Sequence, residues 1–153
     1  MKVITAPNKI IVEPTDGMII FLAGSIEMGA AEKWQDRVIR KLKKTNLVIL
    51  NPRRDDWDSS WEQKITNPQF NEQVNWELDG LSTADEILMY FDPNTKSPIS
   101  LLELGLFVEN DINVVCPEGF WRKGNVDIVC DRYGVTQWNT IDEYIDDLLE
   151  DLN

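Results

Sequence analysis

Four short apolar runs, each followed by a polar loop, constrain the fold of this chain more than any other feature of its sequence. The runs are "MIIFLAG" at 18–24, "LVILNP" at 47–52, "EILMYFD" at 86–92 and "INVVCPEG" at 112–119. A run without polar alternation is typical of a strand that is covered on both faces. Because longer amphipathic segments separate the runs, we predict an α/β fold in which a parallel sheet lies between two layers of helices.

Apolar residues recur at helical spacing between the predicted strands and after the last one. Asn67 and Pro68 are a typical start for the second of these helices, and Thr140 is a suitable N-cap for the last. A further strand or hairpin is expected within residues 2–14. The predicted core-facing stripes are Ala31, Trp34, Val38 and Leu42; Phe70, Val74, Leu78 and Leu81; and Ile141, Tyr144, Ile145, Leu148, Leu149 and Leu152.

Composition narrows the classes of function. The 153 residues predict a single domain, 1–153, and the net charge of -12 disfavours nucleic acid and anionic membranes as partners. No apolar run approaches the roughly 20 residues that cross a bilayer, the start of the chain lacks a signal-peptide pattern, and there are only two cysteines. We therefore expect a cytoplasmic protein. The chain has no histidine, so we expect no metal site and catalysis by carboxylates.

The loop after the first run is a candidate ligand-binding turn. Ligands of parallel sheets bind beyond the carboxyl ends of the strands, where the strand order reverses. In "LAGS", the backbone N–H groups of Ala23, Gly24 and Ser25 could hold a sugar hydroxyl or a phosphate, although an ordinary strand-to-helix turn explains them equally well. The segment is neither a P-loop nor a full dinucleotide-binding fingerprint.

The loop after the second run combines charge with aromatic rings. "RRDDWDSSW" places Trp57 and Trp61 beside Asp56. Indole rings in such a loop either stack on a planar ligand such as a base or attach the loop to the domain. The sequence leaves both interpretations open.

An acid within an apolar helix is the strongest indication of catalysis. Glu103 lies in "PISLLELGLFVEN" at 98–110, where burial of a carboxylate costs several kcal/mol unless something compensates. Glu77 lies on or beside the stripe of the preceding helix. Two carboxylates in one crevice suffice to displace a sugar substituent, since one attacks the anomeric carbon and the other protonates the leaving group. A solvent-facing position remains the alternative for each. Asp85, a second candidate proton donor, fits a turn or capping acid better.

Four segments, in order, resemble the nucleoside 2-deoxyribosyltransferase superfamily, closest to its second deoxyribosyltransferase-like branch. They are "IIFLAGSIE", "NWELDGLSTADEILMYF", "PISLLELGLF" and "NVDIVCDRYGV", and the resemblance covers residues 18 to about 136. The "LLELG" helix is its most specific part. The resemblance implies a flavodoxin-like (Rossmann-like) three-layer sandwich with five parallel strands. It also implies a glutamate that forms a covalent ester with deoxyribose.

The resemblance assigns roles by position. Glu103 matches the nucleophile, and Glu77 falls where the family usually has an aspartate that handles the leaving base. Asn125 matches an asparagine that reaches into a neighbouring subunit's site, which implies a homodimer or higher oligomer. Phe21 stands where many members have a tyrosine that helps to orient the nucleophile, so this hydroxyl is missing here.

Ser97 makes the 5′ end of the substrate an open question. Transferases often have an aspartate at this position, whereas related nucleotide hydrolases have a phosphate-binding serine; Asp92 is a candidate substitute for the missing acid. The residues expected to bind substrate are Phe21, Ala23, Gly24, Ser25, Asp56, Trp57, Trp61, Asp92, Ser97, Asn125 and Asp127.

These features favour a pentosyltransferase that moves deoxyribose from a 2′-deoxynucleoside to a free nucleobase, without a cofactor. The first alternative is hydrolysis of a 2′-deoxynucleoside 5′-monophosphate, with Ser97, Arg122 and Lys123 as phosphate partners. The second is a non-catalytic module that binds a nucleotide.

Overall fold

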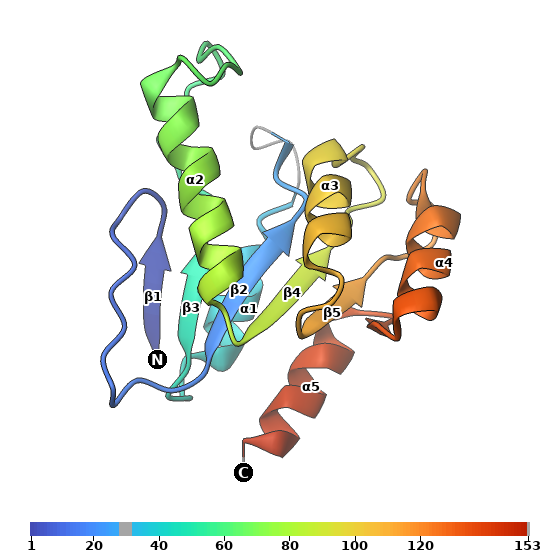
Figure 1. Cartoon of the computed structure of the whole chain (residues 1–153). Helices are drawn as coiled ribbons and strands as arrows, with labels where there is room; N and C mark the ends of the chain where they lie inside the picture. Colours follow the sequence, from blue (N-terminus) through green and yellow to red (C-terminus); the bar gives the residue numbers. More distant parts are fainter. Residues whose placement is uncertain (28–31, 153) are drawn as a thin grey trace.

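The computed structural model describes residues 1–27 and 32–152, and these form one parallel sheet between two layers of helices (Figure 1). The described strands are β1 (Lys2–Thr5), β2 (Ile19–Gly24), β3 (Val48–Asn51), β4 (Glu86–Tyr90), β5 (Ile112–Val115) and β6 (Thr136–Trp138). Their order in the sheet is β1-β3-β2-β4-β5-β6, and every neighbouring pair is parallel. The predicted three-layer α/β fold is therefore confirmed, and the four apolar runs form β2, β3, β4 and β5.

The described sheet has six strands rather than the five expected. At one edge, β1 pairs in parallel with β3, with Lys2 beside Val48, so the expected first element is a strand of the sheet rather than a hairpin. At the other edge, β6 pairs with β5. The sequence does not predict β6 because it is only three residues long, and Thr136 and Gln137 are exposed, so no apolar run marks it.

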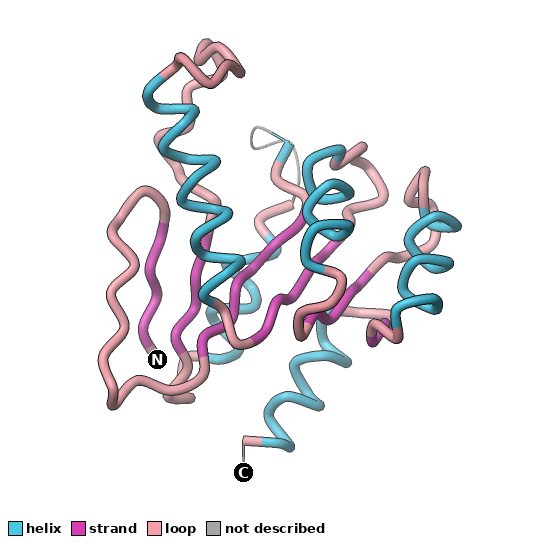
Figure 2. Tube along the Cα trace, in the orientation of Figure 1, coloured by secondary structure: helices cyan, strands magenta, loops and turns pink. Residues whose placement is uncertain are grey.

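The helices divide between the two faces of the sheet. The described helices are α1 (Trp34–Leu42), α2 (Pro68–Thr83), α3 (Pro98–Phe107), α4 (Lys123–Tyr133) and α5 (Ile141–Asp151). Side chains of α2, α3 and α4 share one apolar core with the strands, and side chains of α1 and α5 share the other. Figure 2 shows α2 and α3 side by side in front of the central strands. The candidate site is built on this face.

The predicted helix starts are confirmed. The Asn67 side chain accepts a hydrogen bond from the N–H of Phe70, and Pro68 occupies the first turn of α2. In the same way, the Thr140 side chain accepts from the N–H of Glu143 at the start of α5. These caps satisfy N–H groups that would otherwise have no partner. Ala31, predicted as part of the α1 stripe, lies outside the described residues.

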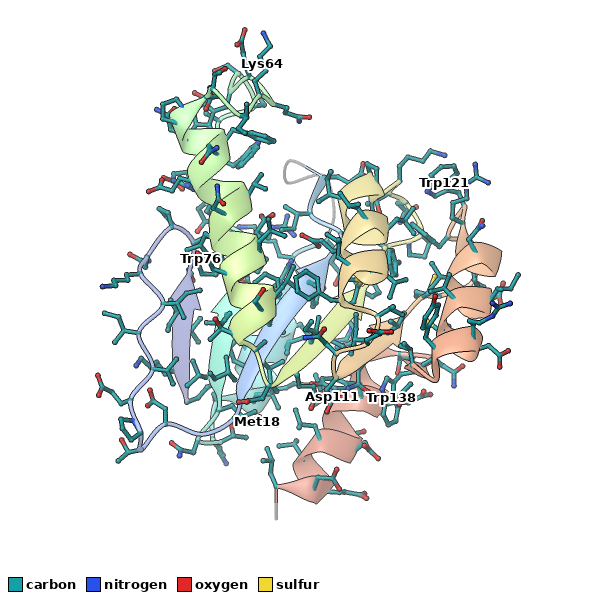
Figure 3. The ribbon with its side chains drawn as sticks, in the orientation of Figure 1. Met18, Lys64, Trp76, Asp111, Trp121 and Trp138 are labelled. Atoms are coloured by element: carbon teal, nitrogen blue, oxygen red, sulfur yellow. The ribbon has the colours of Figure 1, made fainter. Side chains whose placement is uncertain are left out.

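The buried face of α2 differs from the predicted stripe. Leu81 is buried as expected, but Leu78 is 36 % exposed and Phe70 and Val74 are only partly buried. The helix instead buries Gln73, Trp76 and Gly80. At Gly80 a Cβ atom would stand 2.6 Å from the ring of Phe21, so the absence of a side chain lets α2 approach β2 closely. Trp76 points from α2 toward the sheet, as Figure 3 shows.

The strand order places the start of α3 at a functional position. After β2 the chain adds β3 on one side of β2 and then β4 on the other side, so the strand order reverses at β2. The carboxyl ends of β2 and β4 lie on either side of this reversal. Crevices of this kind hold the ligand in open α/β sheets. The loop after β4 leads into α3, so α3 begins beside this reversal.

Candidate active site

Glu77 on α2 and Glu103 on α3 form the centre of the candidate site. Glu103 is 8 % exposed although it belongs to an apolar helix, and Glu77 is partly buried. The two side chains lie close enough for the charge of Glu77 to raise the pKa of Glu103. Within the described part of the chain, no donor forms a hydrogen bond with the Glu103 carboxyl group. The solvent-facing alternative for Glu103 is therefore excluded.

Burial raises the pKa of both carboxyl groups into the neutral range. Loss of hydration, followed by the charge of Glu77, raises the pKa of Glu103 to about 8. Loss of hydration raises the pKa of Glu77 to about 7, against the lowering effect of a hydrogen bond from Gln73. Between these values the pair shares one proton. One group is then a carboxylate and the other a carboxylic acid, and glycosidic bond cleavage needs both forms.

Gln73 connects Glu77 to the loop after β3. Its Nε2 donates to Oε1 of Glu77 at 2.7 Å and to the carbonyl of Pro52 at 2.9 Å. On the other side of the amide, Arg54 donates to Oε1 of Gln73 at 3.5 Å. Sequence patterns do not reveal this role, because a glutamine on a helix indicates an exposed position unless its partners are known.

The loop after β3 brings the predicted tryptophans together. The rings of Trp57 and Trp61 meet edge to face with their centroids 5.0 Å apart, and the Arg54 guanidinium lies 5.1 Å from the centre of Trp61. Nε1 of Trp57 is buried without a hydrogen-bond partner among the described residues. Through Arg54 and Gln73, this aromatic pair is linked to Glu77. Asp56 is exposed and binds Arg54 at 2.6 Å, so it positions the arginine.

Hydroxyl groups cluster at the carboxyl ends of β2 and β4, where the strand order reverses. The Oγ atoms of Ser25 and Ser97 are 2.5 Å apart, and Oγ1 of Thr95 lies 2.7 Å from the Ser97 oxygen and 2.9 Å from the Ser25 oxygen. Ser25 also accepts from the N–H of Asp92 at 2.8 Å. All four residues are buried. The Asp92 carboxylate accepts from the N–H of Asn94, so it stabilises the loop after β4.

Glu27 is a residue of this region that the sequence analysis does not single out. Its Oε1 accepts hydrogen bonds from the N–H groups of Lys96 at 2.6 Å and Ser97 at 2.5 Å, at the start of α3. No motif marks such a contact, because Glu27 and Ser97 are 70 positions apart.

Phe21, Ala23 and Gly24, which the sequence predicts to bind substrate, pack against neighbouring parts of the fold. Phe21 and Ala23 are each 1 % exposed within the core, and the Phe21 ring packs against Trp76. Gly24 has a φ of 127°, and a Cβ atom there would overlap the backbone of Tyr90 on β4. The glycine is therefore required by the neighbouring strand, which is the ordinary turn interpretation.

Asp85 lies before the amino end of β4, whereas α3 begins beyond the carboxyl end of the same strand. It precedes β4, and its carboxylate accepts from the N–H of Ile19 at 2.8 Å where β2 begins. This exposed residue fixes the amino ends of two strands. This contact supports the capping interpretation of Asp85, and its role as a proton donor stays a prediction.

Asn125 and Asp127 lie on α4, apart from the carboxyl pair. Asn125 lines a groove between α3 and α4, and Glu103 is not among the lining residues, which are Leu101, Leu104, Gly105, Arg122, Asn125, Val126 and Val129. Asp127 lines a second hollow beside β5 and β6, where it binds Lys123 and Gln137. Among the described residues, neither side chain forms a hydrogen bond with Glu77 or Glu103.

Cysteine thiols and metal-binding clusters of side chains are the other kinds of reactive group to consider in the described residues. Cys116 and Cys130 are free and buried, and burial raises the pKa of their thiols to about 12 and about 11. Across residues 1–27 and 32–152, no cluster of cysteine and acidic side chains is arranged to hold a metal ion. None of the described helices is both long and apolar enough to pass through a membrane.

Comparison with known proteins identifies one related family. A family model described as nucleoside 2-deoxyribosyltransferase like matches residues 17–120. The matched region includes β2 to β5 and both Glu77 and Glu103. A search of curated proteins finds no match.

Proposed function

Because the chain belongs to the nucleoside 2-deoxyribosyltransferase like family, we propose that it transfers deoxyribose from a 2′-deoxynucleoside to a free nucleobase. The family indicates glycosyl transfer or related chemistry. The paired carboxyl groups of Glu77 and Glu103 are the observation that carries the more specific proposal, since they share one proton near neutral pH.

The proposed reaction has two displacement steps. First, a carboxylate oxygen of Glu103 bonds to C1′ as the C1′–N bond breaks, and the protonated Glu77 gives its proton to the departing base. Second, a nitrogen of the acceptor base attacks C1′, the ester bond to Glu103 breaks, and the Glu77 carboxylate takes the proton lost by the acceptor. Both carboxyl groups return to their starting forms. The absence of a 2′-hydroxyl favours the cation-like transition state.

The proton distribution in the free protein fits these roles after one proton transfer. Glu77 has the lower pKa, so it is the first of the pair to ionise, and Glu103 retains its proton. The reactive form needs the reverse arrangement. The charge of Glu77 contributes to the raised pKa of Glu103, and this contribution disappears when the proton moves to Glu77. The two singly ionised forms are therefore close in free energy, and substrate binding can select the reactive one.

The proposal includes a second copy of the chain. Ile99, Leu102 and Leu106 lie on one side of α3 and are 59 %, 58 % and 59 % exposed. Ile128 on α4 is 69 % exposed, and the groove that contains Asn125 lies between these two helices. An exposed apolar face beside the candidate site is typical of a subunit interface. A second copy bound there would bring an Asn125 from outside, which supports the expected homodimer or higher oligomer.

Base exchange by the Glu103→Gln variant tests the proposed function. The wild type should convert a 2′-deoxynucleoside and a different free base into the exchanged nucleoside, measured by chromatography. Glutamine keeps the size of the side chain but is not a nucleophile, so the rate should fall by about a thousandfold or more. Glu109→Gln, at an exposed position after α3, is the matched control and should keep full activity. Exchange by Glu103→Gln at the wild-type rate would exclude this assignment.

A further inference from the structure

Arg54 lies in the loop after β3, which Figure 1 shows leading to the N-terminal end of α2, and its side chain is 8 % exposed. Its Nε and Nη2 atoms donate to the two carboxylate oxygens of Asp56 at 2.6 Å and 2.8 Å. Its Nη1 atom donates to Oε1 of Gln73 at 3.5 Å, and the guanidinium lies 5.1 Å from the centre of the Trp61 ring. Removing a cation from water is costly unless charged and hydrogen-bonding partners compensate. These partners therefore hold the guanidinium in one place.

The amide of Gln73 has one orientation that satisfies its partners. Gln73 is 3 % exposed, so its hydrogen bonds come from the protein. The carbonyl of Pro52 can only accept a hydrogen bond, and the guanidinium of Arg54 can only donate one. Nε2 of Gln73 therefore faces Pro52, and Oε1 faces Arg54. In this orientation Nε2 also reaches Glu77.

This orientation decides what Gln73 offers to Glu77. A free amide oxygen could accept a hydrogen bond from protonated Glu77 and would favour the acid, whereas an N–H group favours the carboxylate. Because Arg54 occupies the amide oxygen, Glu77 receives the N–H group. A positive charge on the oxygen side of an amide also polarises the group and strengthens its N–H as a donor.

The charged groups around these hydrogen bonds agree with an indirect effect of the arginine. Burial and the bond from the amide shift the pKa of Glu77 in opposite directions. Glu103 is its charged neighbour on the facing helix, α3. The hydrogen bond to Asp56 raises the pKa of Arg54, and the nearby charge of Glu72 adds to this effect. The arginine therefore stays charged, and its printed hydrogen bonds lead to Glu77 through the amide.

We propose that Arg54 is a positioning residue: by holding the amide oxygen of Gln73, it directs the N–H group of Gln73 to Glu77 and so favours the ionised form of Glu77. The inference rests on the proposed function only in taking Glu77 as the group that exchanges a proton with the base. The effect of Arg54 on Glu77 belongs to the folded protein and is measurable without a substrate.

A double-mutant cycle tests whether Arg54 acts through Gln73. Arg54→Met removes the charge and the donors but keeps most of the length of the side chain, and it is combined with Gln73→Leu. The pKa of Glu77 is measured by carbon-13 NMR titration of its carboxyl group, whose signal is assigned by its absence in Glu77→Gln. All proteins in the titration carry Glu103→Gln, so that Glu77 titrates alone.

Arg54→Met should raise the pKa of Glu77 by about half a unit or more, the size expected for weakening one hydrogen bond. In Gln73→Leu the same substitution should cause no further rise, because the link is already broken. Arg40→Met makes the same change of charge at an exposed position on α1 and should leave the pKa unchanged. An unchanged pKa in Arg54→Met would overturn the proposal. So would an equal rise with and without Gln73, because the arginine would then act directly through its charge.

Arg54→Lys is the second variant if Arg54→Met is poorly folded. Lysine keeps the charge but lacks the planar fork, so it cannot hold both oxygens of Asp56 and the amide of Gln73 in the same arrangement. It should also raise the pKa of Glu77, and only in protein that contains Gln73. A wild-type pKa in Arg54→Lys would show that charge alone is sufficient and would contradict the positioning role.

Base exchange separates this proposal from the proposed function. With Glu103 intact, Arg54→Met should shift the acidic limb of the kcat/KM profile to higher pH, and addition of Gln73→Leu should shift it no further. A shift of the Glu77 titration without a shift of this profile would mean that Glu77 does not exchange the proton with the base. The proposed function would then fail while the positioning role stands. If the wild type shows no base exchange, the titration alone decides the role of Arg54.

Discussion

Nε2 of Gln73 lies 2.7 Å from Oε1 of Glu77 and donates a hydrogen bond to it across one turn of α2. The same nitrogen donates to the carbonyl of Pro52, which holds the amide in this orientation. Because the bond favours the ionised form of Glu77, it limits the rise in pKa that burial causes. Gln73 therefore opposes the effect of burial and lowers the pKa of Glu77.

Replacing Gln73 with leucine should move the pH dependence of activity to higher pH. Without the donor, the pKa of Glu77 rises above about 7, so at pH 7 fewer molecules contain the singly ionised pair. We expect the acidic limb of the kcat/KM profile to shift upward and the rate at pH 7 to fall severalfold. Gln69→Leu, an exposed position on the same helix, should leave the profile unchanged. Identical profiles for Gln73→Leu and the wild type would show that the hydrogen bond does not set this pKa.

Glu103→Gln should stabilise the protein at high pH but hardly at low pH. The pKa of Glu103 is raised from 4.5 to about 8, so the unfolded chain releases this proton well before the folded protein does. Stability contributed by the protonated form is complete below pH 4.5 and is lost progressively as the pH rises to about 8. Glutamine cannot ionise, so the variant avoids this loss. Urea denaturation should show a gain of up to about 5 kcal/mol at pH 9 and little change at pH 4. An equal gain at both pH values would contradict the buried-acid interpretation.

The sequence predicts the central strands well because burial on both faces leaves continuous apolar runs. It predicts the inner face of α2 less well for a physical reason. The close approach of α2 to β2 requires a residue without a side chain at position 80, which is Gly80. The hydrogen bond to Glu77 requires a polar residue at position 73, which is Gln73. Both residues weaken the apolar stripe that would mark this face. The resulting stripe prediction includes Leu78, which is on the exposed side.

The candidate site likewise contains residues that the sequence marks and residues that it does not. Glu103 is detectable from the sequence because its apolar neighbours lie within a few positions of it, and an acid in such a segment is unusual. The contact of Glu27 with the N–H of Ser97 is not detectable, because the two residues are 70 positions apart. Asp85 shows the converse, since a chemically suitable acid lies before the amino end of β4, away from the start of α3. Residue type and local spacing therefore predict candidates, whereas the topology decides which of them come together.

Leu102→Glu should dissociate the proposed oligomer. Leu102 is at the centre of the exposed apolar row on α3, and a charge there would be buried in the interface without a partner. Sedimentation or light scattering should show an oligomer for the wild type and monomers for the variant. Ile11→Glu makes the same change at another half-exposed position and should not alter the mass. If Asn125 acts across the interface, base exchange should fall with dissociation. A wild-type monomer with full activity would exclude a shared site.

Gly24→Ala tests whether the glycine after β2 serves the fold or a ligand. Its φ of 127° is unfavourable for alanine, and the new Cβ atom would overlap the backbone of Tyr90, which is paired with β2 and cannot move freely. We expect a loss of about 3 kcal/mol or more in the free energy of unfolding, measured by denaturation without any ligand. The control is Gly124→Ala in the first turn of α4, where no atom lies within 4 Å of the new Cβ; its stability should change by no more than about 0.5 kcal/mol. A stable Gly24→Ala protein that loses only substrate binding would instead favour a ligand-binding turn. The expected result would mean that the close pairing of β2 with β4 requires a glycine at this position. The proposed chemistry depends instead on side chains of α2 and α3.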